Sequence, residues 1–413
     1  MKKSSDLEVL SAFENAIAKV VDQSKPAVVS LFMEKTGEKD NKRQSGKGSG
    51  FVFQQDGYIL TNAHVVEGAI NFRVELFDGS IYDARLVGAD KLTDIAVLKI
   101  EGAAAFPVLP IADAQDVRVG QFAIAIGHPM GYKYTVTAGI VGGKDRCSHE
   151  NNDLFQYHHN YIQTDAWINP GSSGGPLLNI KGEVIGVTAL NPGEGSTLAV
   201  DSGSAKKIAH QLIAYGSIIR GHFDAHLQSV PEGLHVKKVK PGTAAARSGL
   251  QRDDTLVEFD GEKVSGLSAF ERRVMEYPIG KRCDLKVLRH GQEITLQVVI
   301  DEMPLELVGR AVETESAAWK TLGLAVRKLT EGTYQRYAYL TAEDRGILVE
   351  KVKKDSPSFK AKIPRGALIV AINGEDIIDT ETLETFLQTQ QDISKITFDM
   401  NGVHGREKVT IQL

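Results

Sequence analysis

The chain has 413 residues, of which 42% are hydrophobic and 24% are charged, so it holds enough apolar material for two or three separate cores and disorder is not expected. Its formal net charge of -5, without a basic stretch interleaved with aromatic residues, argues against nucleic acid as a partner. It also lacks a run of about 18 uncharged apolar residues, which argues against a transmembrane helix.

The first predicted element is a helix over residues 6–22, where apolar side chains recur every three or four positions, and Pro26 ends it. The pattern then changes to short apolar runs separated by Gly, Asp-Gly and Pro. These runs fall at residues 27–32, 50–53, 72–77, 95–100, 122–126, 135–141 and 184–189. Because no helices alternate with them, they predict antiparallel barrels or sandwiches rather than a parallel α/β sheet.

A predicted helix over residues 205–215 leads into an internal repeat. Residues 233–264 align without a gap on residues 346–377, an offset of 113 residues (346 minus 233). Each copy has the pattern strand, turn, short helix, strand and turn, followed by a helical stretch and closing strands. The sequence therefore predicts one larger β domain followed by two copies of a smaller module.

The strongest local motif is Gly-Ser-Ser-Gly-Gly-Pro-Leu at residues 171–177. It also matches the G-x-S-x-G pattern of the α/β-hydrolase nucleophile elbow, in which a helix follows the serine at once. Here Pro176 precedes two β runs joined by a turn at residues 179–182, which indicates a hairpin. An α/β hydrolase also takes its histidine from after the serine, whereas the best-placed histidine here comes before it.

That histidine is His64, which follows an Asp-Gly turn and an apolar strand. Taken alone, such a histidine is more often a hydrogen-bonded side chain of the core. However, Asp94 heads a strongly apolar strand, where an unpaired carboxylate is costly to bury. A histidine whose second ring nitrogen faces a serine hydroxyl would supply the partner that Asp94 needs.

The order His64, Asp94, Ser173 resembles that of the chymotrypsin-like serine peptidases, and specifically the HtrA (Deg) family of peptidases with PDZ domains. The resemblance covers nearly the whole chain and rests on the motifs TNAHVV, TDIAVLKI, AIGHPMGYKYTVTAGIV and TDAWINPGSSGGPL. One departure is Ser172, which stands where the family usually has Asn and adds a second hydroxyl beside the nucleophile. Ser173 is assigned because it alone directly precedes the Gly-Gly-Pro turn, as the family serine does.

The resemblance implies a mainly β fold with a chymotrypsin-like double β-barrel protease domain over residues 1–215, including the N-terminal helix. It also implies PDZ domains over residues 216–302 and 319–413, which are joined by a Glu-rich connector at residues 303–318. PDZ domains bind chain termini by adding a strand to a sheet edge.

The resemblance also implies the role of each catalytic group. His64 would take the proton of Ser173 as general base, and Asp94 would orient the imidazole and stabilise its charged form. The backbone N–H groups of Gly171 and Ser173 would form the oxyanion hole.

For the substrate pocket, the position six residues before Ser173 decides charge preference in trypsins, and here it is Trp167. P1 is the substrate residue on the acyl side of the cleaved bond, and a basic side chain is therefore not expected there. The family resemblance implies small or medium aliphatic P1 side chains. Ile168 and Leu190 are the further residues expected to line the pocket. Trp167 itself departs from the small residue usual in the family. Two interpretations stay open, that it narrows the pocket or that it packs against a neighbour.

The second PDZ module fits the family's carboxylate-binding loop at Leu322, Gly323 and Leu324. The first has Asp224 where the family has glycine, and its negative charge should repel a terminal carboxylate. The hypothesis is that the first module binds internal segments or serves in assembly, with use as a spacer as the alternative.

No cofactor and no metal are expected. Cys147, His149, His158 and His159 could bind a metal, but their spacing matches no compact zinc motif. Cys147 and Cys283, the only cysteines, fall in different predicted domains, which argues against a disulfide.

The resemblance implies an ATP-independent serine endopeptidase that degrades unfolded or damaged proteins and also holds them as a chaperone. The expected partners are unfolded proteins, peptide C-termini at the PDZ domains, and further copies of the chain in a homotrimer or a multiple of trimers, with contacts through residues such as Phe13. The resemblance favours a periplasmic or other extracytoplasmic location. Residues 1–6 lack the apolar stretch of a secretory signal, so an exported form would already have lost it. The alternative from another class is a chaperone or PDZ scaffold with a largely inactive triad.

Overall fold

The computed structural model describes residues 6–36, 43–102, 105–146, 161–193, 196–304, 316–389, 394–403 and 405–413. It divides into two compact units, Met1–Ile218 and Ile219–Leu413. Among the described residues, no helix combines the length and the apolar character that crossing a membrane would require.

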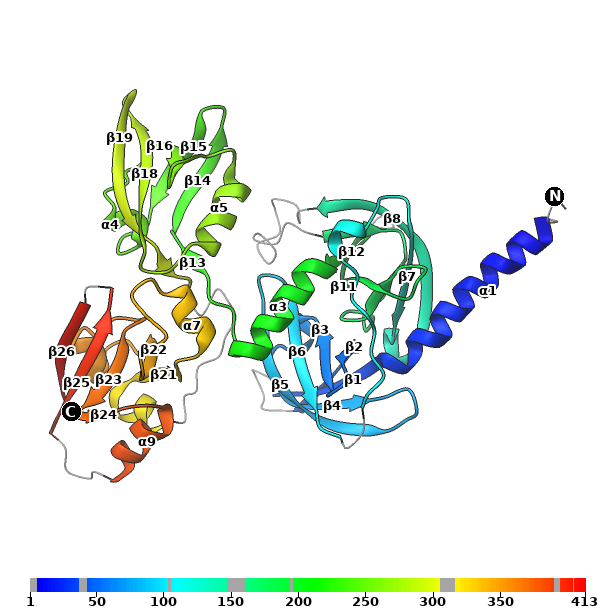
Figure 1. Cartoon of the computed structure of the whole chain (residues 1–413), viewed down its shortest axis with the longest axis horizontal. Helices are drawn as coiled ribbons and strands as arrows, with labels where there is room; N and C mark the ends of the chain where they lie inside the picture. Colours follow the sequence, from blue (N-terminus) through cyan, green and yellow to red (C-terminus); the bar gives the residue numbers. More distant parts are fainter. Residues whose placement is uncertain are drawn as a thin grey trace. The chain divides into compact units, whose positions relative to one another are not determined.

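The first unit contains two closed antiparallel barrels (Figure 1). In the first barrel neighbouring strands follow the order β1-β2-β3-β6-β5-β4. Its strands are β1 Val28–Thr36, β2 Arg43–Gln54, β3 Tyr58–Thr61, β4 Ala69–Glu75, β5 Ile81–Asp90 and β6 Ile95–Ile100. The barrel closes because β1 pairs with both β2 and β4.

The second barrel has the order β10-β11-β12-β9-β8-β7. Its strands are β7 Phe122–Gly127, β8 Thr135–Arg146, β9 Tyr161–Thr164, β10 Pro176–Leu178, β11 Val184–Gly193 and β12 Ser196–Asp201. One apolar cluster takes side chains from both barrels, including Phe51 and Leu60 from the first and Ile124 and Val200 from the second. The shared core fixes the barrels against each other, and the mainly β double-barrel fold predicted from the sequence is confirmed.

Short helices flank the barrels: α2 Ala63–Val66, η2 Ala114–Asp116 and η3 Pro129–Gly131. The longer helix α3 Ser202–Tyr215 starts where the Asp201 side chain accepts a hydrogen bond from the Ser204 N–H and ends at the left-handed residue Gly216. Its apolar face packs against strands of both barrels and so stabilises their arrangement.

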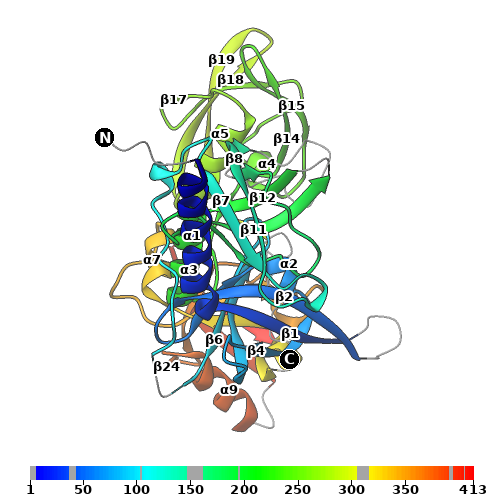
Figure 2. The same ribbon diagram turned by 90° about the vertical axis from the view of Figure 1, so that its right-hand side faces the viewer.

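Helix α1 Asp6–Ser24 precedes a single 3-10 turn, η1 Lys25–Ala27. It buries only Val20, Val21 and Ser24, all near its C-terminal end. The N-terminal part of the helix extends away from the barrels (Figure 1) and lies in front of them in the view of Figure 2. Four of its large apolar side chains are exposed: Leu7, Val9, Leu10 and Phe13.

The second unit contains two similar antiparallel sheets, of order β14-β15-β16-β18-β19 and β21-β22-β23-β25-β26. The first copy comprises β13 Gly221–His222, β14 Ala225–Val230, β15 Gly233–Val239, α4 Ala244–Arg247, β16 Thr255–Phe259, β17 Glu262–Lys263, α5 Leu267–Glu276, β18 Arg282–Arg289, β19 Gln292–Val299 and β20 Asp301–Glu302. The second comprises η4 Ala318–Leu322, β21 Leu324–Lys328, α7 Glu331–Arg336, β22 Ile347–Val352, α8 Pro357–Lys360, β23 Leu368–Ile372, β24 Glu375–Asp376, α9 Thr380–Thr389, β25 Lys395–Gly402 and β26 Gly405–Gln412.

From α4 to β19, every element of the first copy recurs 113 residues later; α5 Leu267–Glu276, for example, corresponds to α9 Thr380–Thr389. The repeat seen in the sequence is therefore a structural repeat. The copies differ between their first two long strands. Residues 231–232 join β14 to β15, whereas residues 329–346 join β21 to β22.

Candidate active site

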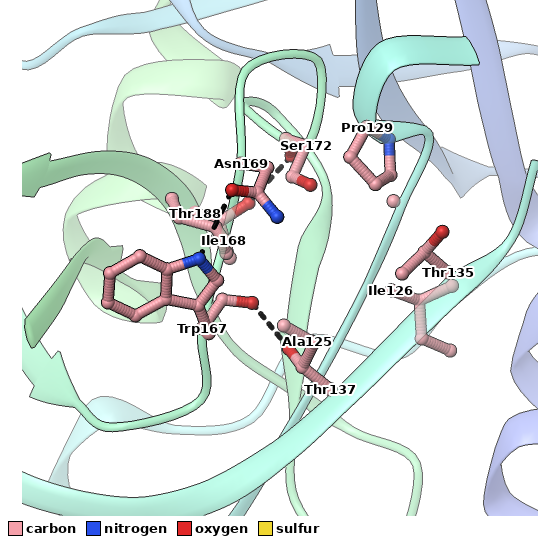
Figure 3. A pocket seen from close by; sticks show the side chains of 11 residues that line it. Ala125, Ile126, Pro129, Thr135, Thr137, Trp167, Ile168, Asn169, Ser172 and Thr188 are labelled. Atoms are coloured by element: carbon pink, nitrogen blue, oxygen red, sulfur yellow. Dashed lines mark hydrogen bonds between the residues drawn. The ribbon is translucent and has the colours of Figure 1, made fainter. Parts of the chain in front are cut away.

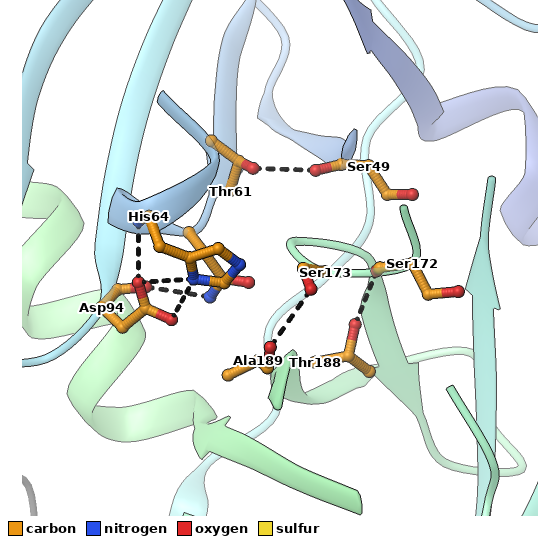
Figure 4. A network of polar contacts seen from close by, with 9 residues as sticks. Ser49, Thr61, His64, Asp94, Ser172, Ser173, Thr188 and Ala189 are labelled. Carbon is orange, nitrogen blue, oxygen red and sulfur yellow. Dashed lines mark hydrogen bonds and ion pairs between the residues drawn. The ribbon is translucent and has the colours of Figure 1, made fainter. Parts of the chain in front are cut away.

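Neighbouring strands of the first barrel bring His64 and Asp94 together (Figure 4). His64 lies in α2, just after β3, and Asp94 lies just before β6, which pairs with β3. The His64 Nδ1 atom is 2.8 Å from Asp94 Oδ2 and 3.0 Å from Oδ1. Because an ionised carboxylate can only accept, this contact places the proton of a neutral imidazole on Nδ1 and leaves Nε2 as an acceptor.

The Asp94 carboxylate is held by more than the imidazole. It also accepts the backbone N–H of His64 at 3.0 Å, and the Asn62 amide donates to the Asp94 carbonyl at 2.9 Å. Only 2% of Asp94 is exposed, whereas 42% of the His64 side chain is. The carboxylate is thus fixed in the interior, whereas the imidazole is accessible from outside.

Ser173 lies in the turn before β10 and faces the His64 ring (Figure 4). Its hydroxyl donates to the Ala189 carbonyl at 3.1 Å. The turn is pinned on both sides, because Ser49 N–H donates to the Ser173 carbonyl and Gly174 N–H donates to the Thr188 carbonyl. Position 174 requires glycine: its φ is 86°, and a Cβ would come within 2.2 Å of the Ser49 carbonyl oxygen.

The predicted oxyanion loop, residues 169–173, is anchored to the first barrel by Ser49. The Ser49 hydroxyl donates to the Gly171 carbonyl at 2.7 Å and accepts the His128 N–H at 2.9 Å. Among the described residues, neither the Gly171 nor the Ser173 N–H has a protein acceptor. Two unpaired donors beside a serine hydroxyl are what an oxyanion hole requires.

The two neighbouring hydroxyls point in different directions. Figure 4 shows the Ser172 side chain turned away from His64, on the other side of the loop from Ser173. Ser172 is buried, and its carbonyl accepts the Thr188 hydroxyl at 2.9 Å. In this arrangement the Ser172 hydroxyl cannot transfer a proton to His64.

Ser172 lines a small cavity under the loop (Figure 3). Two of the residues predicted for the substrate pocket, Trp167 and Ile168, line it as well, but Leu190 does not and packs instead beside the shared core of the barrels. The cavity volume is about 10 Å³, room for roughly one water molecule. As it stands, it cannot accept an aliphatic side chain.

Trp167 is 44% exposed. Its indole N–H donates to the Asn169 side chain at 3.1 Å, and its carbonyl accepts the Thr137 hydroxyl at 2.7 Å (Figure 3). The side chain therefore lines the cavity and also contacts the predicted oxyanion loop.

His128 lies directly behind the loop and is 2% exposed. Its Nδ1 accepts the Tyr134 N–H at 3.3 Å, and its Nε2 is buried without a partner among the described residues. Burial lowers the pKa of His128 to about 4, because the charged imidazolium would lose its hydration.

In the second copy of the repeat, Leu322 and Leu324 are buried in the core, so at these positions only the backbone could contact a peptide. Gly323 has a φ of 71°, and a Cβ there would meet the Ser356 Cβ at 2.3 Å. Its N–H already donates to the Trp319 carbonyl at 3.1 Å. A terminal carboxylate would have to displace that bond to use this donor.

In the first PDZ module, Asp224 takes the left-handed conformation that Gly323 takes in the second, with a φ of 56°. Its carboxylate lies 3.2 Å from Lys240 Nζ and 3.6 Å from His222 Nε2. The loop thus already contains a carboxylate of its own, with the Lys240 ammonium beside it.

Cys147, His149, His158 and His159 lie outside the described residues. Within the described ranges no group of histidine, cysteine and acidic side chains could hold a metal ion. Cys283 is a buried free thiol, and burial raises its pKa to about 12.

Sequence analysis did not identify Ser49 as a site residue. The available signal was its position between Gly48 and Gly50, where a Cβ on either would come within 3 Å of a neighbouring atom. That pattern indicates close packing against β2, but nothing in it identifies Gly171, 122 residues later, as the partner.

Comparison with known proteins gives two family matches, a trypsin-like peptidase domain over residues 48–187 and a PDZ domain over residues 216–300. A probable periplasmic serine endoprotease, DegP-like, of Chlamydia trachomatis is 36% identical over 371 residues, covering 86% of this chain and 72% of that relative. The periplasmic pH-dependent serine endoprotease DegQ of Escherichia coli is 31% identical over 399 residues, covering 88% of this chain and 84% of DegQ.

Solved structures of serine proteases also match this chain. A serine endoprotease from Yersinia pestis matches with a TM-score of 0.60 and 34% identity, covering 69% of this chain and 97% of that one. The HtrA-type protease AlgW with a decapeptide matches with a TM-score of 0.63 and 29% identity, covering 70% of this chain and 98% of that one.

Proposed function

Since the chain belongs to the HtrA (Deg) family of serine endoproteases, we propose that His64, Asp94 and Ser173 are the triad with which it hydrolyses peptide bonds. It is a serine endopeptidase that degrades unfolded or damaged proteins without ATP. The observation that carries the assignment is the geometry around His64, whose Nδ1 lies 2.8 Å from a buried carboxylate while its other nitrogen faces the Ser173 hydroxyl (Figure 4).

The mechanism follows from these contacts. On substrate binding the Ser173 hydroxyl leaves the Ala189 carbonyl and gives its proton to His64 Nε2 as the oxygen attacks the scissile carbonyl. The Gly171 and Ser173 N–H groups stabilise the resulting oxyanion. His64 then protonates the leaving amine, and Asp94 stabilises the imidazolium in between.

The test compares a reduced, carboxymethylated protein such as α-lactalbumin with its native calcium-bound form. The wild-type chain should cleave the unfolded form preferentially, and Ser173→Ala should lower turnover by about four to six orders of magnitude. Cleavage by Ser173→Ala at the wild-type rate would refute the triad. If neither chain cleaves but both suppress aggregation, the protein is a chaperone or scaffold.

The PDZ domains bind peptide segments of the substrates. We infer that the second module takes free C-termini through Leu322, Gly323 and Leu324, and that the first takes internal segments because the Asp224 carboxylate occupies its loop. The pocket that receives the P1 residue would be shaped by Trp167, Ile168 and Leu190.

We also propose a homotrimer, or a multiple of it, as the family resemblance implies. The names of the relatives support a periplasmic or other extracytoplasmic location. The exposed apolar side chains of α1, such as Leu10 at 64% and Phe13 at 42%, supply a surface for such contacts. Native mass spectrometry of the wild-type chain and of Leu10→Ser tests this, because a trimer held by α1 should dissociate in the variant.

A further inference from the structure

The segment that joins β21 to β22, residues 329–346, is an insertion with no counterpart in the first PDZ module, whose equivalent strands are joined by residues 231–232. It contains α7 and then docks on the first module. Tyr337 forms a parallel bridge with Ile279, in which Ile279 N–H donates to the Arg336 carbonyl at 2.7 Å and Ala338 N–H donates to the Ile279 carbonyl at 2.8 Å.

Arg336 of this insertion caps a helix of the other module. Its guanidinium donates to the carbonyls of Met275 at 2.7 Å, Glu276 at 2.5 Å and Tyr277 at 3.2 Å, at the C-terminal end of α5. The last carbonyls of a helix have no partner within the helix, and a cation there also interacts favourably with the helix dipole. The α5 helix therefore depends on the second module for its C-terminal cap.

A second anchor holds β20. Glu302 is 10% exposed and accepts the Tyr337 hydroxyl, and its carboxylate lies 3.0 Å from Arg365 Nη2 and 3.7 Å from Arg327 Nη2. Tyr337 is 1% exposed and also accepts from Arg327 at 2.9 Å. These are charge-assisted contacts in a largely buried place, so losing one partner would leave a buried charge without its counterpart.

Both anchors lie beside the carboxylate loop of the first module, residues 221–225. Its start, β13, pairs with β20, with Gly221 opposite Glu302. On the other side, Gly221 packs so closely against the last turn of α5 that a Cβ there would come within 2.1 Å of the Val274 carbonyl oxygen. Phe223 of the loop contacts Phe270 of α5 edge to face, with ring centroids 5.5 Å apart.

In a PDZ domain the peptide lies between the edge strand, here β14, and this helix, with its end at the loop. We propose that the insertion positions the peptide site of the first PDZ module, so that this module binds its ligand tightly only while the second module is docked on it. The inference rests on the proposed peptide binding by the first module. Because linkage is reciprocal, a peptide bound to the first module also stabilises the docked pair.

The experiment uses the full-length chain carrying Ser173→Ala, so that the probe, unfolded β-casein, is bound and not cut. Hydrogen exchange of residues 221–230 and 267–277 is followed as β-casein is added. The variants are Arg336→Ala and the milder Tyr337→Phe, which keeps the ring and removes only the hydroxyl. The matched control is Arg345→Ala. Arg345 is an exposed arginine of the same insertion whose hydrogen bonds, within the described ranges, go to carbonyls of its own turn.

We expect Arg336→Ala to raise exchange of both segments about tenfold and to raise by about tenfold the β-casein concentration needed to protect residues 225–230, which is about 1.4 kcal/mol. Tyr337→Phe should give about a threefold shift, and Arg345→Ala none. Equal β-casein requirements in Arg336→Ala and Arg345→Ala would overturn the inference even if α5 exchanged faster. Absence of protection at residues 225–230 in the parent chain would instead overturn peptide binding by the first module, and the inference with it.

Discussion

Ser49 and Gly171 lie 122 residues apart in the sequence, and the hydroxyl of one donates to the carbonyl of the other at 2.7 Å. This bond crosses from β2 of the first barrel to the oxyanion loop of the second. It fixes the direction of the Gly171 carbonyl and, through the rigid peptide plane, the orientation of the loop that we propose supplies the oxyanion hole.

Ser49→Ala should therefore lower kcat about tenfold and leave KM nearly unchanged. The effect is smaller than the 10²- to 10³-fold loss typical when an oxyanion-hole donor itself is removed, because Ser49 acts through the loop. Steady-state cleavage of an unfolded substrate measures it. Ser45→Ala, an exposed serine of the same strand, is the control and should behave like wild type. A Ser49→Ala enzyme with unchanged kcat would mean that the loop holds its position without this bond.

Ser172→Ala should keep activity within about threefold of wild type, because the Ser172 hydroxyl faces the small cavity and not His64 (Figure 4). Labelling with a fluorophosphonate gives a second measurement, since only the activated serine is modified. Ser172→Ala should be labelled and Ser173→Ala should not. The opposite pattern would identify Ser172 as the nucleophile.

The residue pattern predicted an antiparallel barrel or sandwich and the repeat because both leave a local signal, whereas the double barrel was implied by the family resemblance. Short apolar runs punctuated by turns marked the strands, and the offset of 113 residues recurs from α4 to β26. The length of strand β2 was underestimated, because the predicted run covered residues 50–53 whereas β2 begins at Arg43. Its Gly-rich first half has low strand propensity and is ordered by pairing with β1, a tertiary effect that no local pattern contains.

Site residues that lie in a sequence motif could be predicted. Residues that act through a contact with a distant part of the sequence could not. His64, Asp94 and Ser173 stand in recognisable motifs, and the structure brings the first two within hydrogen-bonding distance. Ser49 and Arg336 could not be found in this way, because each acts through a backbone carbonyl, and a carbonyl is present at every position. Leu190 was chosen for its position in a strand, but its role in the pocket stays a prediction.

Acid should destabilise the protease unit through His128. Burial lowers the pKa of His128 from its ordinary 6.5 to about 4. Between pH 6.5 and pH 4 the unfolded chain binds a proton at this histidine that the folded chain does not. The free energy of unfolding is therefore unaffected by His128 at pH 7 and decreases as the pH falls from 6.5 towards 4. At pH 5 protonation of this histidine in the unfolded chain lowers the free energy of unfolding by about 2 kcal/mol.

His128→Asn should remove that loss, because the amide oxygen can still accept the Tyr134 N–H but cannot take up a proton. Urea unfolding followed by Trp167 fluorescence, in a chain carrying Trp319→Phe, compares pH 7 with pH 5. The free energy of unfolding should fall by about 2 kcal/mol less in His128→Asn than in its parent. His210→Asn, on the exposed side of α3, is the control. Equal losses in all three chains would show that His128 is not the responsible group.

Asp224→Gly should convert the first PDZ module into one that binds free C-termini. The substitution removes the carboxylate that now lies 3.2 Å from Lys240 Nζ, and glycine adopts the φ of 56° without strain. Lys240 would then be available to an incoming terminal carboxylate. We expect a peptide with a free C-terminus to bind at least fivefold more tightly, with new hydrogen-exchange protection at residues 221–230, and amidation of the peptide should abolish the gain.

The control variant is Asp253→Gly, which is matched in charge and in positive φ. Asp253 lies in a turn away from the loop, so this substitution should leave peptide binding unchanged. If the parent chain already protects residues 221–230 with the free peptide and loses that protection on amidation, Asp224 does not repel carboxylates and the two PDZ modules share one specificity.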